Sequence, residues 1–253
     1  MRHKVLKKIV GLFGYKLISK KTVKNERILG KFNYLKLPKI LEYLVENKLV
    51  NSLIQIGAND GNRFDDLNLL IKKYKIKSTL VEPINENFEQ LKKNYNNIQN
   101  INFENSAISV NNELSYLYKV KLEYLNKYGE HIKGISSFKK QHLIDHGVKK
   151  LHIKKQKINS ISIKELLNKY EIKDFDLLFL DAEGYDGTIV NDFLDNSLIK
   201  PYIIFEFIHI ENEIFNQLVQ KLNKKNYKLF NIYENIICIP EEKNFLFFNP
   251  VRK

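Results

Sequence analysis

A short turn bounded by two glycines is the first feature of the sequence that could hold a ligand. It follows the apolar run Ser52–Ile56 and reads Gly57-Ala58-Asn59-Asp60-Gly61. Glycines let the backbone approach a ligand closely and adopt dihedral angles that other residues avoid. A dinucleotide site has the spacing G-x-G-x-x-G, in which the middle glycine makes room for a pyrophosphate. Because Asn59 occupies that middle position, the turn disfavours a nicotinamide or flavin site and with it an NAD-dependent dehydrogenase.

An acidic residue follows the next apolar run, Ser78–Val81. Glu82 lies 25 residues after Gly57. At the carboxyl end of a strand beside a glycine turn, a carboxylate can accept hydrogen bonds from both hydroxyls of an adenosine ribose. The alternative is a surface acid stiffened by Pro83. If Glu82 binds a ribose, the segment Asn105-Ser106-Ala107, after the third expected strand, borders the adenine.

Two carboxylates and a histidine follow two later apolar runs. Asp181 comes directly after Phe175–Leu180, and Glu206 and His209 lie at the end of Tyr202–Phe207. In a parallel sheet these ends share one edge, so the three groups can converge. One imidazole with two carboxylates suits Mg²⁺, Mn²⁺ or Fe(II). The alternative is structural: a helix cap, an acceptor for a backbone amide and an ordinary half-buried histidine.

The elements that must position these groups alternate between strand and helix. From residue 52 onward, short β-rich runs alternate with helical patterns of about ten residues, which predicts βαβ units and a parallel α/β sheet. The polar segment 121–150 interrupts this order, and because long loops usually carry function we expect a substrate lid there. Besides the runs already named, the pattern predicts a strand over Ile101–Ile108, helices over Ile161–Tyr170, Tyr185–Phe193 and Ile214–Leu222, and a terminal antiparallel hairpin formed by Tyr227–Ile232 and Ile236–Ile239.

Four motifs in order along the chain carry a family resemblance. They are Gln55 to Gly61, Val81-Glu82-Pro83, Asn105 to Ile108 and Leu180-Asp181-Ala182-Glu183-Gly184-Tyr185-Asp186, with Gly134 to Phe138 and Phe205-Glu206-Phe207 fitting the same pattern. Over roughly residues 50–240 the chain resembles the FkbM family of methyltransferases. The resemblance implies a Rossmann-like class I fold, a seven-stranded mostly parallel sheet with a terminal antiparallel hairpin, and S-adenosylmethionine as cofactor. It implies O-methylation of sugars or polyketide-type natural products.

The resemblance also implies a set of cofactor-binding residues. One departure stands out, since the family often has Asp at the position of Gln55, which helps to orient the methionine moiety; Asp60 is expected to compensate. The expected cofactor residues are Gln55, Gly57, Ala58, Asn59, Asp60, Gly61, Glu82, Ser106 and Ala107.

Methyl transfer to a hydroxyl requires a positioned and deprotonated acceptor, because the cofactor is already activated. A general base or a divalent cation at Asp181, Glu206 and His209 would supply the deprotonation. The candidate bases are His131 in the segment 121–150, then Glu183, with His209 serving if no metal is bound.

The remaining polar residues of this region are expected to contact substrate or solvent. Ser136, Ser137 and Tyr185 are candidate substrate contacts, with turn-forming and packing roles as the alternatives. The lysines of 121–155 could meet a diphosphate. Three histidines of a polar, Lys-rich stretch are predicted to be surface residues: His142, His146 and His152.

Positive charge is concentrated at the start of the chain. Residues 1–40 contain 12 Lys/Arg and one acid, a net charge of +11, whereas the whole chain carries +13. We expect residues 1–50 to form a basic helical N-terminal extension before a methyltransferase domain over 51–253. Residues 1–20 can pack an apolar face on that domain or contact an anionic membrane surface.

The single cysteine, Cys238, lies in an apolar run, so no disulfide is expected and the setting is reducing. No apolar run approaches the roughly 18 residues that span a bilayer. We therefore expect a cytoplasmic protein, with the inner face of the membrane as an alternative.

Two other functions compete with sugar O-methylation. A nucleic-acid methyltransferase is suggested by the basic balance and 14 tyrosines, but base-methylating enzymes usually carry an Asn/Asp-Pro-Pro-Tyr-like turn where this chain has Asp181 to Gly184, so no nucleic acid is expected. A membrane- or partner-binding protein with a vestigial cofactor pocket is disfavoured because Gly57, Gly61 and Glu82 are intact. The family resemblance thus implies O-methylation of a sugar, in particular a nucleotide-linked hexose or heptose for capsule or other surface polysaccharide.

Overall fold

The structure, a computed structural model, describes residues 36–63, 65–110, 116–129, 132 and 134–243. The expectations for the basic residues 1–35, including those for residues 1–20, and for His131 lie outside the described residues. Within them, no helix is both long enough and apolar enough to cross a membrane.

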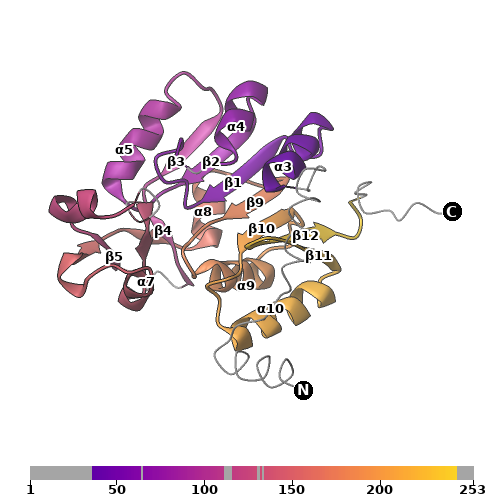
Figure 1. Cartoon of the computed structure of the whole chain (residues 1–253). Helices are drawn as coiled ribbons and strands as arrows, with labels where there is room; N and C mark the ends of the chain where they lie inside the picture. Colours follow the sequence, from indigo (N-terminus) through magenta and orange to yellow (C-terminus); the bar gives the residue numbers. More distant parts are fainter. Residues whose placement is uncertain (1–35, 64, 111–115, 130–131, 133, 244–253) are drawn as a thin grey trace, which may run out of the picture. The chain divides into compact units, whose positions relative to one another are not determined.

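A seven-stranded sheet forms the centre of the domain and confirms the predicted α/β fold (Figure 1). Its order is β11-β12-β10-β9-β1-β2-β3. The five strands from β10 to β3 are parallel, whereas β12 pairs antiparallel with both β10 and β11. The strands are β1 Ser52–Ile56, β2 Lys77–Val81, β3 Ile101–Glu104, β9 Leu177–Leu180, β10 Tyr202–Glu206, β11 Tyr227–Ile232 and β12 Asn235–Pro240.

Helices cover both faces of this sheet because its strands are apolar on both sides. On β1, Leu53 packs into one hydrophobic cluster, while Ile54 and Ile56 pack into the other, as the two-residue period of a strand requires. One cluster contains residues of α3 Leu37–Glu46, α4 Asn68–Tyr74 and α5 Asn85–Asn94; the other contains residues of α8 Ile163–Lys169, α9 Asp186–Asn196 and α10 Asn212–Lys224 (Figure 1).

Helix α3 precedes residue 51, where the sequence places the start of the domain, and yet it packs into the same core. Its buried residues Ile40, Leu41 and Leu44 are at most 1% exposed and belong to the cluster that includes Leu53 of β1. The apolar core of the domain thus includes a helix that no family motif marks.

The predicted strand Ile101–Ile108 is wrong as one element, because the structure divides it in two. Strand β3 ends at Glu104, and β4 Ala107–Ile108 leaves the main sheet to pair with β8 Ser160–Ile161. Side-chain hydrogen bonds hold the bend between them: Asn105 Nδ2 donates to the Glu82 carbonyl at 2.9 Å, and Ser106 Oγ donates to Glu104 Oε1 at 2.7 Å.

The segment between β4 and β8 folds into a small substructure and not into the long loop predicted over 121–150. Three of its strands form an antiparallel sheet in the order β6-β5-β7, and it has its own apolar cluster around Val120, Leu143 and Ile153. We call it the insertion. Its elements are β5 Tyr116–Val120, the 3₁₀ helix η2 Leu122–Lys127, β6 Ser136–Ser137, α7 Lys140–Asp145, the 3₁₀ helix η3 Lys150–His152 and β7 Ile153–Lys157.

Candidate active site

The turn after β1 needs glycine at both ends. Gly57 has φ +84° and donates its N–H to the Val81 carbonyl at 3.0 Å; a Cβ at this position would overlap the backbone carbonyl oxygen of Asp181. Gly61 has φ +66°, and a Cβ there would overlap the side chains of Leu91 in α5 and of Tyr95 at the C-terminal cap of that helix. The strands β1, β2 and β9 therefore end in close contact, with backbone instead of side chains filling the space between them.

Glu82 is buried, 4% exposed, at the end of β2. Its two carboxylate oxygens accept backbone hydrogen bonds from Asn59 at 3.0 Å and from Ile84 at 2.8 Å. Burial raises the pKa of Glu82 to about 7, although these hydrogen bonds and that of the Asn87 side chain oppose the rise. The alternative of a surface acid is thus wrong, because the carboxylate is held in the wall of the pocket described next.

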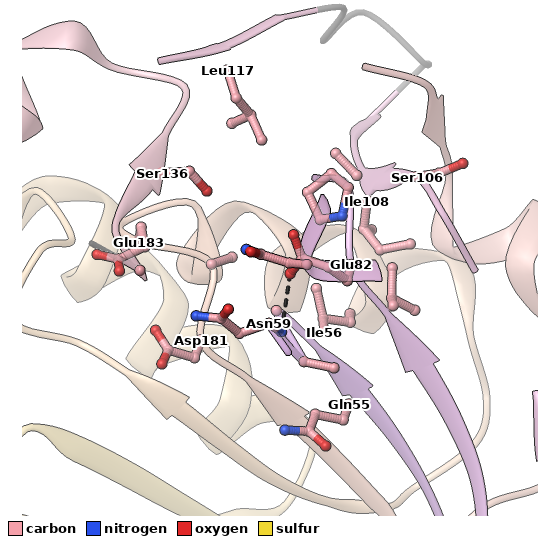
Figure 2. Close-up of a pocket in the computed structure, with 18 of the residues that line it drawn as sticks. Gln55, Ile56, Asn59, Glu82, Ser106, Ile108, Leu117, Ser136, Asp181 and Glu183 are labelled. Carbon is pink, nitrogen blue, oxygen red and sulfur yellow. Dashed lines mark hydrogen bonds between the residues drawn. The ribbon is translucent and has the colours of Figure 1, made fainter. Parts of the chain in front are cut away.

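A pocket of about 860 Å³, counting the part that is open to solvent, lies at the carboxyl ends of β1, β2 and β9 (Figure 2). In Figure 2, Asn59 lies between Glu82 and Asp181. Seven of the nine expected cofactor residues line the pocket: Gln55, Gly57, Ala58, Asn59, Glu82, Ser106 and Ala107.

Asp60 and Gly61 are not among the lining residues, and Asp60 has a different role from the one expected. Its Oδ1 accepts the backbone N–H groups of Asn62 and Arg63, at 3.0 and 2.9 Å, and its Oδ2 pairs with Arg63 Nε at 2.6 Å. These contacts hold the turn, so the Asp60 carboxylate does not replace the family's aspartate in the pocket.

The acidic residue beside Gln55 is Asp65 and not Asp60, and the sequence did not predict it. Gln55 is 3% exposed and donates from Nε2 to Asp65 Oδ1 at 3.1 Å, while its Oε1 is buried and has no hydrogen-bond partner among the described residues. Burial raises the pKa of Asp65. Both side chains line the pocket. No motif marks Asp65, which lies ten positions after Gln55 and beyond the glycine turn.

The turn after β9 forms the opposite wall of the pocket. Asp186 is fully buried and accepts the backbone N–H groups of Ala182 at 3.1 Å and Gly184 at 3.3 Å. Burial raises its pKa to about 6. Glu183 and Gly184 both have positive φ, +51° and +92°. This tight turn directs Asp181 and Glu183 into the pocket lining.

Carboxylates gather at this edge of the sheet. Asp181 faces the open pocket, yet the protein packed around it, followed by the charges of Glu183 and Asp186, raises its pKa well above the usual value. Burial, followed by the same two carboxylates, raises the pKa of Glu206 to about 8. Negative charge is therefore costly here, and the arrangement favours a proton or a cation.

The structure groups the expected metal ligands differently from the sequence. His209 Nε2 lies 3.8 Å from Glu206 Oε2, and donor atoms of Glu183, Glu206 and His209 lie within 4.8 Å of one another. Asp181 belongs to the pocket wall and not to this group. His209 is outside the pocket lining, and burial, followed by the neighbouring His142, lowers its pKa.

The prediction that three histidines of the insertion are surface residues is wrong. His142 is half-buried and its Nε2 lies 2.9 Å from Glu183 Oε2; its ring centroid is 4.5 Å from that of His209. His146 is half-buried in the same place, and His152 stacks on Tyr124 at 3.8 Å. The four-residue spacing of His142 and His146 was the available signal, since it puts both on one side of a helix.

Of the three expected substrate residues, one lines the pocket and two do not. Ser136 lines the pocket, as do Gly134, Phe138 and Leu117 of the insertion. Ser137 is buried and donates from Oγ to the Glu183 carbonyl at 3.1 Å, and Tyr185 packs edge-on against Phe138 at 4.9 Å. Neither Ser137 nor Tyr185 lines the pocket, so their contacts support its wall.

Several methyltransferases are among the solved structures that match this chain. An O-methyltransferase from Bacillus cereus, solved with SAH, matches with 11% identity and a TM-score of 0.45, covering 92% of this chain and 96% of that one. An FkbM methyltransferase from Methylobacillus flagellatus matches with 13% identity and a TM-score of 0.44 over 76% of this chain and 44% of its own. Aeropyrum pernix fibrillarin with bound S-adenosyl-L-methionine matches with 8% identity and a TM-score of 0.38, covering 75% and 66%.

The family is established by sequence. No curated protein sequence matches the chain. The family model described as the methyltransferase FkbM domain, however, matches residues 55–229, which is more than half of the chain. This span begins at Gln55 and includes the glycine turn, Glu82 and the turn after β9. The chain therefore belongs to the FkbM methyltransferases and is an S-adenosylmethionine-dependent methyltransferase.

Proposed function

We propose that this protein transfers the methyl group of S-adenosylmethionine to a hydroxyl of a sugar, namely a nucleotide-linked hexose or heptose destined for capsule or other surface polysaccharide. The observation that carries the proposal is the shared cavity. Glu82, at the end predicted to hold the cofactor, and the carboxylates of Asp181 and Glu183 line one pocket. A hydroxyl bound next to the cofactor would therefore meet an acceptor for its proton.

The residues at the first end of the pocket fit S-adenosylmethionine. The carboxylate of Glu82 is an acceptor for two ribose hydroxyls. The buried Oε1 of Gln55 has no partner within the described residues, and an unpaired buried acceptor suits a donor such as the α-ammonium group of the methionine moiety. Gly57 also lines this end of the pocket, where its turn packs against the Asp181 backbone.

S-adenosylmethionine, when bound, supplies a methyl group that is already activated as part of a sulfonium. The chain must then position the acceptor hydroxyl and remove its proton. Asp181 is the proposed base, because a carboxylate with a raised pKa holds a proton more strongly than an ordinary one. Glu183 forms the adjacent wall, where its hydrogen bond with His142 fixes the position of its carboxylate.

The insertion supports a polyhydroxylated substrate at the open side of the pocket. Ser136 offers a hydroxyl and Phe138 an aromatic ring, which together suit the polar rim and apolar face of a sugar. The lysines expected to meet a diphosphate are not among the described lining residues, whereas Arg63 is. Lys139 pairs with Glu211 at 2.6 Å. The nucleotide portion of the proposal therefore depends on the family resemblance.

The test combines calorimetry with methyl transfer. S-adenosylhomocysteine should bind the purified full chain, and labelled methyl groups should pass to a nucleotide hexose or heptose in a panel that also includes free sugars and RNA. Asp181→Asn should lower kcat about 100- to 10,000-fold, the range for loss of a general base, with little change in affinity for S-adenosylhomocysteine. The matched control is Asp195→Asn. Asp195 lies near the C-terminal end of α9, and its exposed carboxylate pairs with Lys221 of α10.

Three results would contradict the proposal. Methylation of RNA alone would establish the nucleic-acid alternative. Absence of S-adenosylhomocysteine binding would instead support the alternative of a partner-binding protein with a vestigial cofactor pocket. Full activity of Asp181→Asn would remove the proposed base while leaving the substrate class intact.

A further inference from the structure

We propose that His142, His146 and His209 bind a divalent transition-metal ion of the zinc type, with Glu183 or Glu206 as the fourth ligand. The three histidines lie outside the lining of the methyl-transfer pocket, whereas Glu183 is part of that lining. The set shares only His209 and Glu206 with the cation site expected from the sequence. The proposal rests on the arrangement of the side chains and does not depend on the substrate proposed above.

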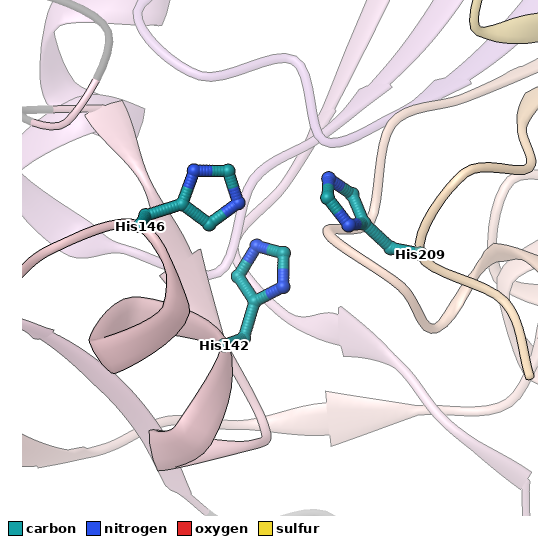
Figure 3. A group of neighbouring side chains, drawn as sticks. All are labelled: His142, His146 and His209. Carbon is teal, nitrogen blue, oxygen red and sulfur yellow. The ribbon is translucent and has the colours of Figure 1, made fainter. Parts of the chain in front are cut away.

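The three imidazoles meet from two distant parts of the chain (Figure 3). His142 and His146 are one helical turn apart, at α7 and its C-terminal cap, whereas His209 follows β10. One nitrogen of each ring lies within 4.8 Å of the other two. Zn–N bonds of 2.0–2.1 Å in a tetrahedron put ligand nitrogens about 3.3 Å apart, so modest ring rotations bring all three into range.

A carboxylate for the fourth position is already adjacent. Glu183 Oε2 lies 2.9 Å from His142 Nε2, and Glu183 and Glu206 share a second group with His209 in which all donor atoms are within 4.8 Å. Three neutral imidazoles and one carboxylate form a tetrahedral set with a net charge of −1, which compensates a dication in part. Without a bound cation, several half-buried carboxylates lie close together at this position.

The chemistry of the donors selects the ion. Imidazole nitrogen suits zinc, copper, iron and nickel, whereas magnesium and calcium prefer sites made of oxygen ligands. A set dominated by three nitrogens therefore favours an ion of the zinc type over Mg²⁺, which is one of the three ions expected at Asp181, Glu206 and His209.

The position of the site indicates what the ion would do. Two of its ligands belong to the insertion, and the others belong to the turns after β9 and β10 in the main domain. His209 is held closely by Gly184, where an added Cβ would lie 3.2 Å from the His209 Cβ. A bound ion would thus fasten α7 to the wall of the pocket next to Glu183, and would fix the insertion over the substrate side.

The experiment measures metal binding by the full chain without methyl donor or acceptor, so that its result is separate from that of the methyl-transfer assay. Protein treated with chelator is titrated with Zn²⁺ in competition with a chromophoric chelator, and with Co²⁺, whose visible absorption reports tetrahedral coordination. We expect one tight ion per chain and a tetrahedral cobalt spectrum. His142→Ala, His146→Ala and His209→Ala should each weaken zinc binding at least tenfold and abolish the cobalt spectrum.

A matched control and a second readout complete the test. His152→Ala removes another half-buried histidine of the insertion, one that stacks on Tyr124 away from the cluster, and should bind zinc as the wild type does. His146→Gln serves if an alanine variant fails to fold. Hydrogen exchange should show the amides of α7 protected by zinc in the wild type only. Wild-type zinc affinity in the His142→Ala or His146→Gln variant, or the absence of one-to-one binding, would overturn the proposal.

Discussion

At the scale of single residues, Gly57 and Glu82 shape the cofactor side of the pocket by different means. Gly57 contributes the absence of a side chain next to the Asp181 carbonyl, and Glu82 contributes a buried carboxylate. Both positions follow from the sequence, because a glycine turn and an acid at consecutive strand ends have few other uses in this fold.

Gly57→Ala should weaken cofactor binding. The residue has φ +84°, and the new Cβ would overlap the Asp181 backbone, so the turn must move. We expect the affinity for S-adenosylhomocysteine, measured by calorimetry, to fall at least tenfold and the free energy of unfolding to fall by about 1–3 kcal/mol. Gly147→Ala is the control: Gly147 has φ +83°, but nothing lies within 4 Å of the added Cβ. Equal loss of affinity in both variants would mean that backbone strain alone is responsible.

Glu82 should make stability depend on pH. Its pKa is about 7 in the folded protein and near 4.5 when unfolded, so the folded state holds the extra proton between these values. The contribution of Glu82 to the free energy of unfolding without ligand should therefore fall by on the order of 3 kcal/mol as the pH rises from 4.5 to 7, and this contribution should level off above pH 7. Urea unfolding of wild type and Glu82→Gln across this range checks the prediction, because the variant lacks this contribution.

The same variant tests the contact with the ribose. Glu82→Gln should lower the affinity for S-adenosylhomocysteine at pH 8, since an amide has one acceptor oxygen in place of two. Glu86→Gln, which changes a half-exposed acid on α5 outside the pocket lining, should leave that affinity unchanged. If the two variants bind equally well, Glu82 is only a support for the turn.

Other site residues could not be found from the sequence, because tertiary contacts decide their roles. Asp60 has the residue type and place of a cofactor ligand, but Arg63, three residues further on, engages its carboxylate. Asp65 is placed at the site by a tertiary contact, the hydrogen bond from Gln55, which no local pattern announces. Asp181 and Glu183 were predictable, since both occupy the turn directly after a central strand.

At the scale of secondary-structure elements, periodic and apolar segments were predicted best. All seven strands of the main sheet were expected to within a few residues, apart from the division after Glu104, where two side-chain hydrogen bonds bend the chain. The insertion was missed as a folded unit because its strands are short and pair over distance, such as Tyr116 with Lys157. Such pairings leave no local pattern.

Helix α3 should be necessary for the stability of the domain. Leu41 of this helix is fully buried in the core of the domain, so Leu41→Ala should lower the free energy of unfolding by about 2–5 kcal/mol in urea titrations. The matched control is Leu198→Ala, which removes the same atoms from a side chain that is 97% exposed and should change the value by less than about 0.5 kcal/mol. A small effect of Leu41→Ala would mean that the domain folds independently of this helix.

At the scale of the whole molecule, charge is distributed unevenly. Residues 1–40 carry +11 of the net +13, and the rest is nearly balanced. Full-length protein should therefore float with phosphatidylcholine vesicles that contain phosphatidylserine, and a chain that lacks residues 1–35 but keeps α3 should not. The binding should weaken with salt, because it depends on charge. Equal flotation of the two proteins would exclude the basic segment as a membrane contact.

The only cysteine of the chain, Cys238, lies fully buried in β12, and burial raises the pKa of its thiol above the usual range. Thiol reagents attack the thiolate form of accessible cysteines, so the native protein should react slowly with a maleimide dye. A single fluorophore can then be attached at Leu151→Cys, an 81% exposed position of the insertion, without removing the native cysteine. The enzyme is thus ready for spectroscopic measurement of how the insertion moves when substrate or metal binds.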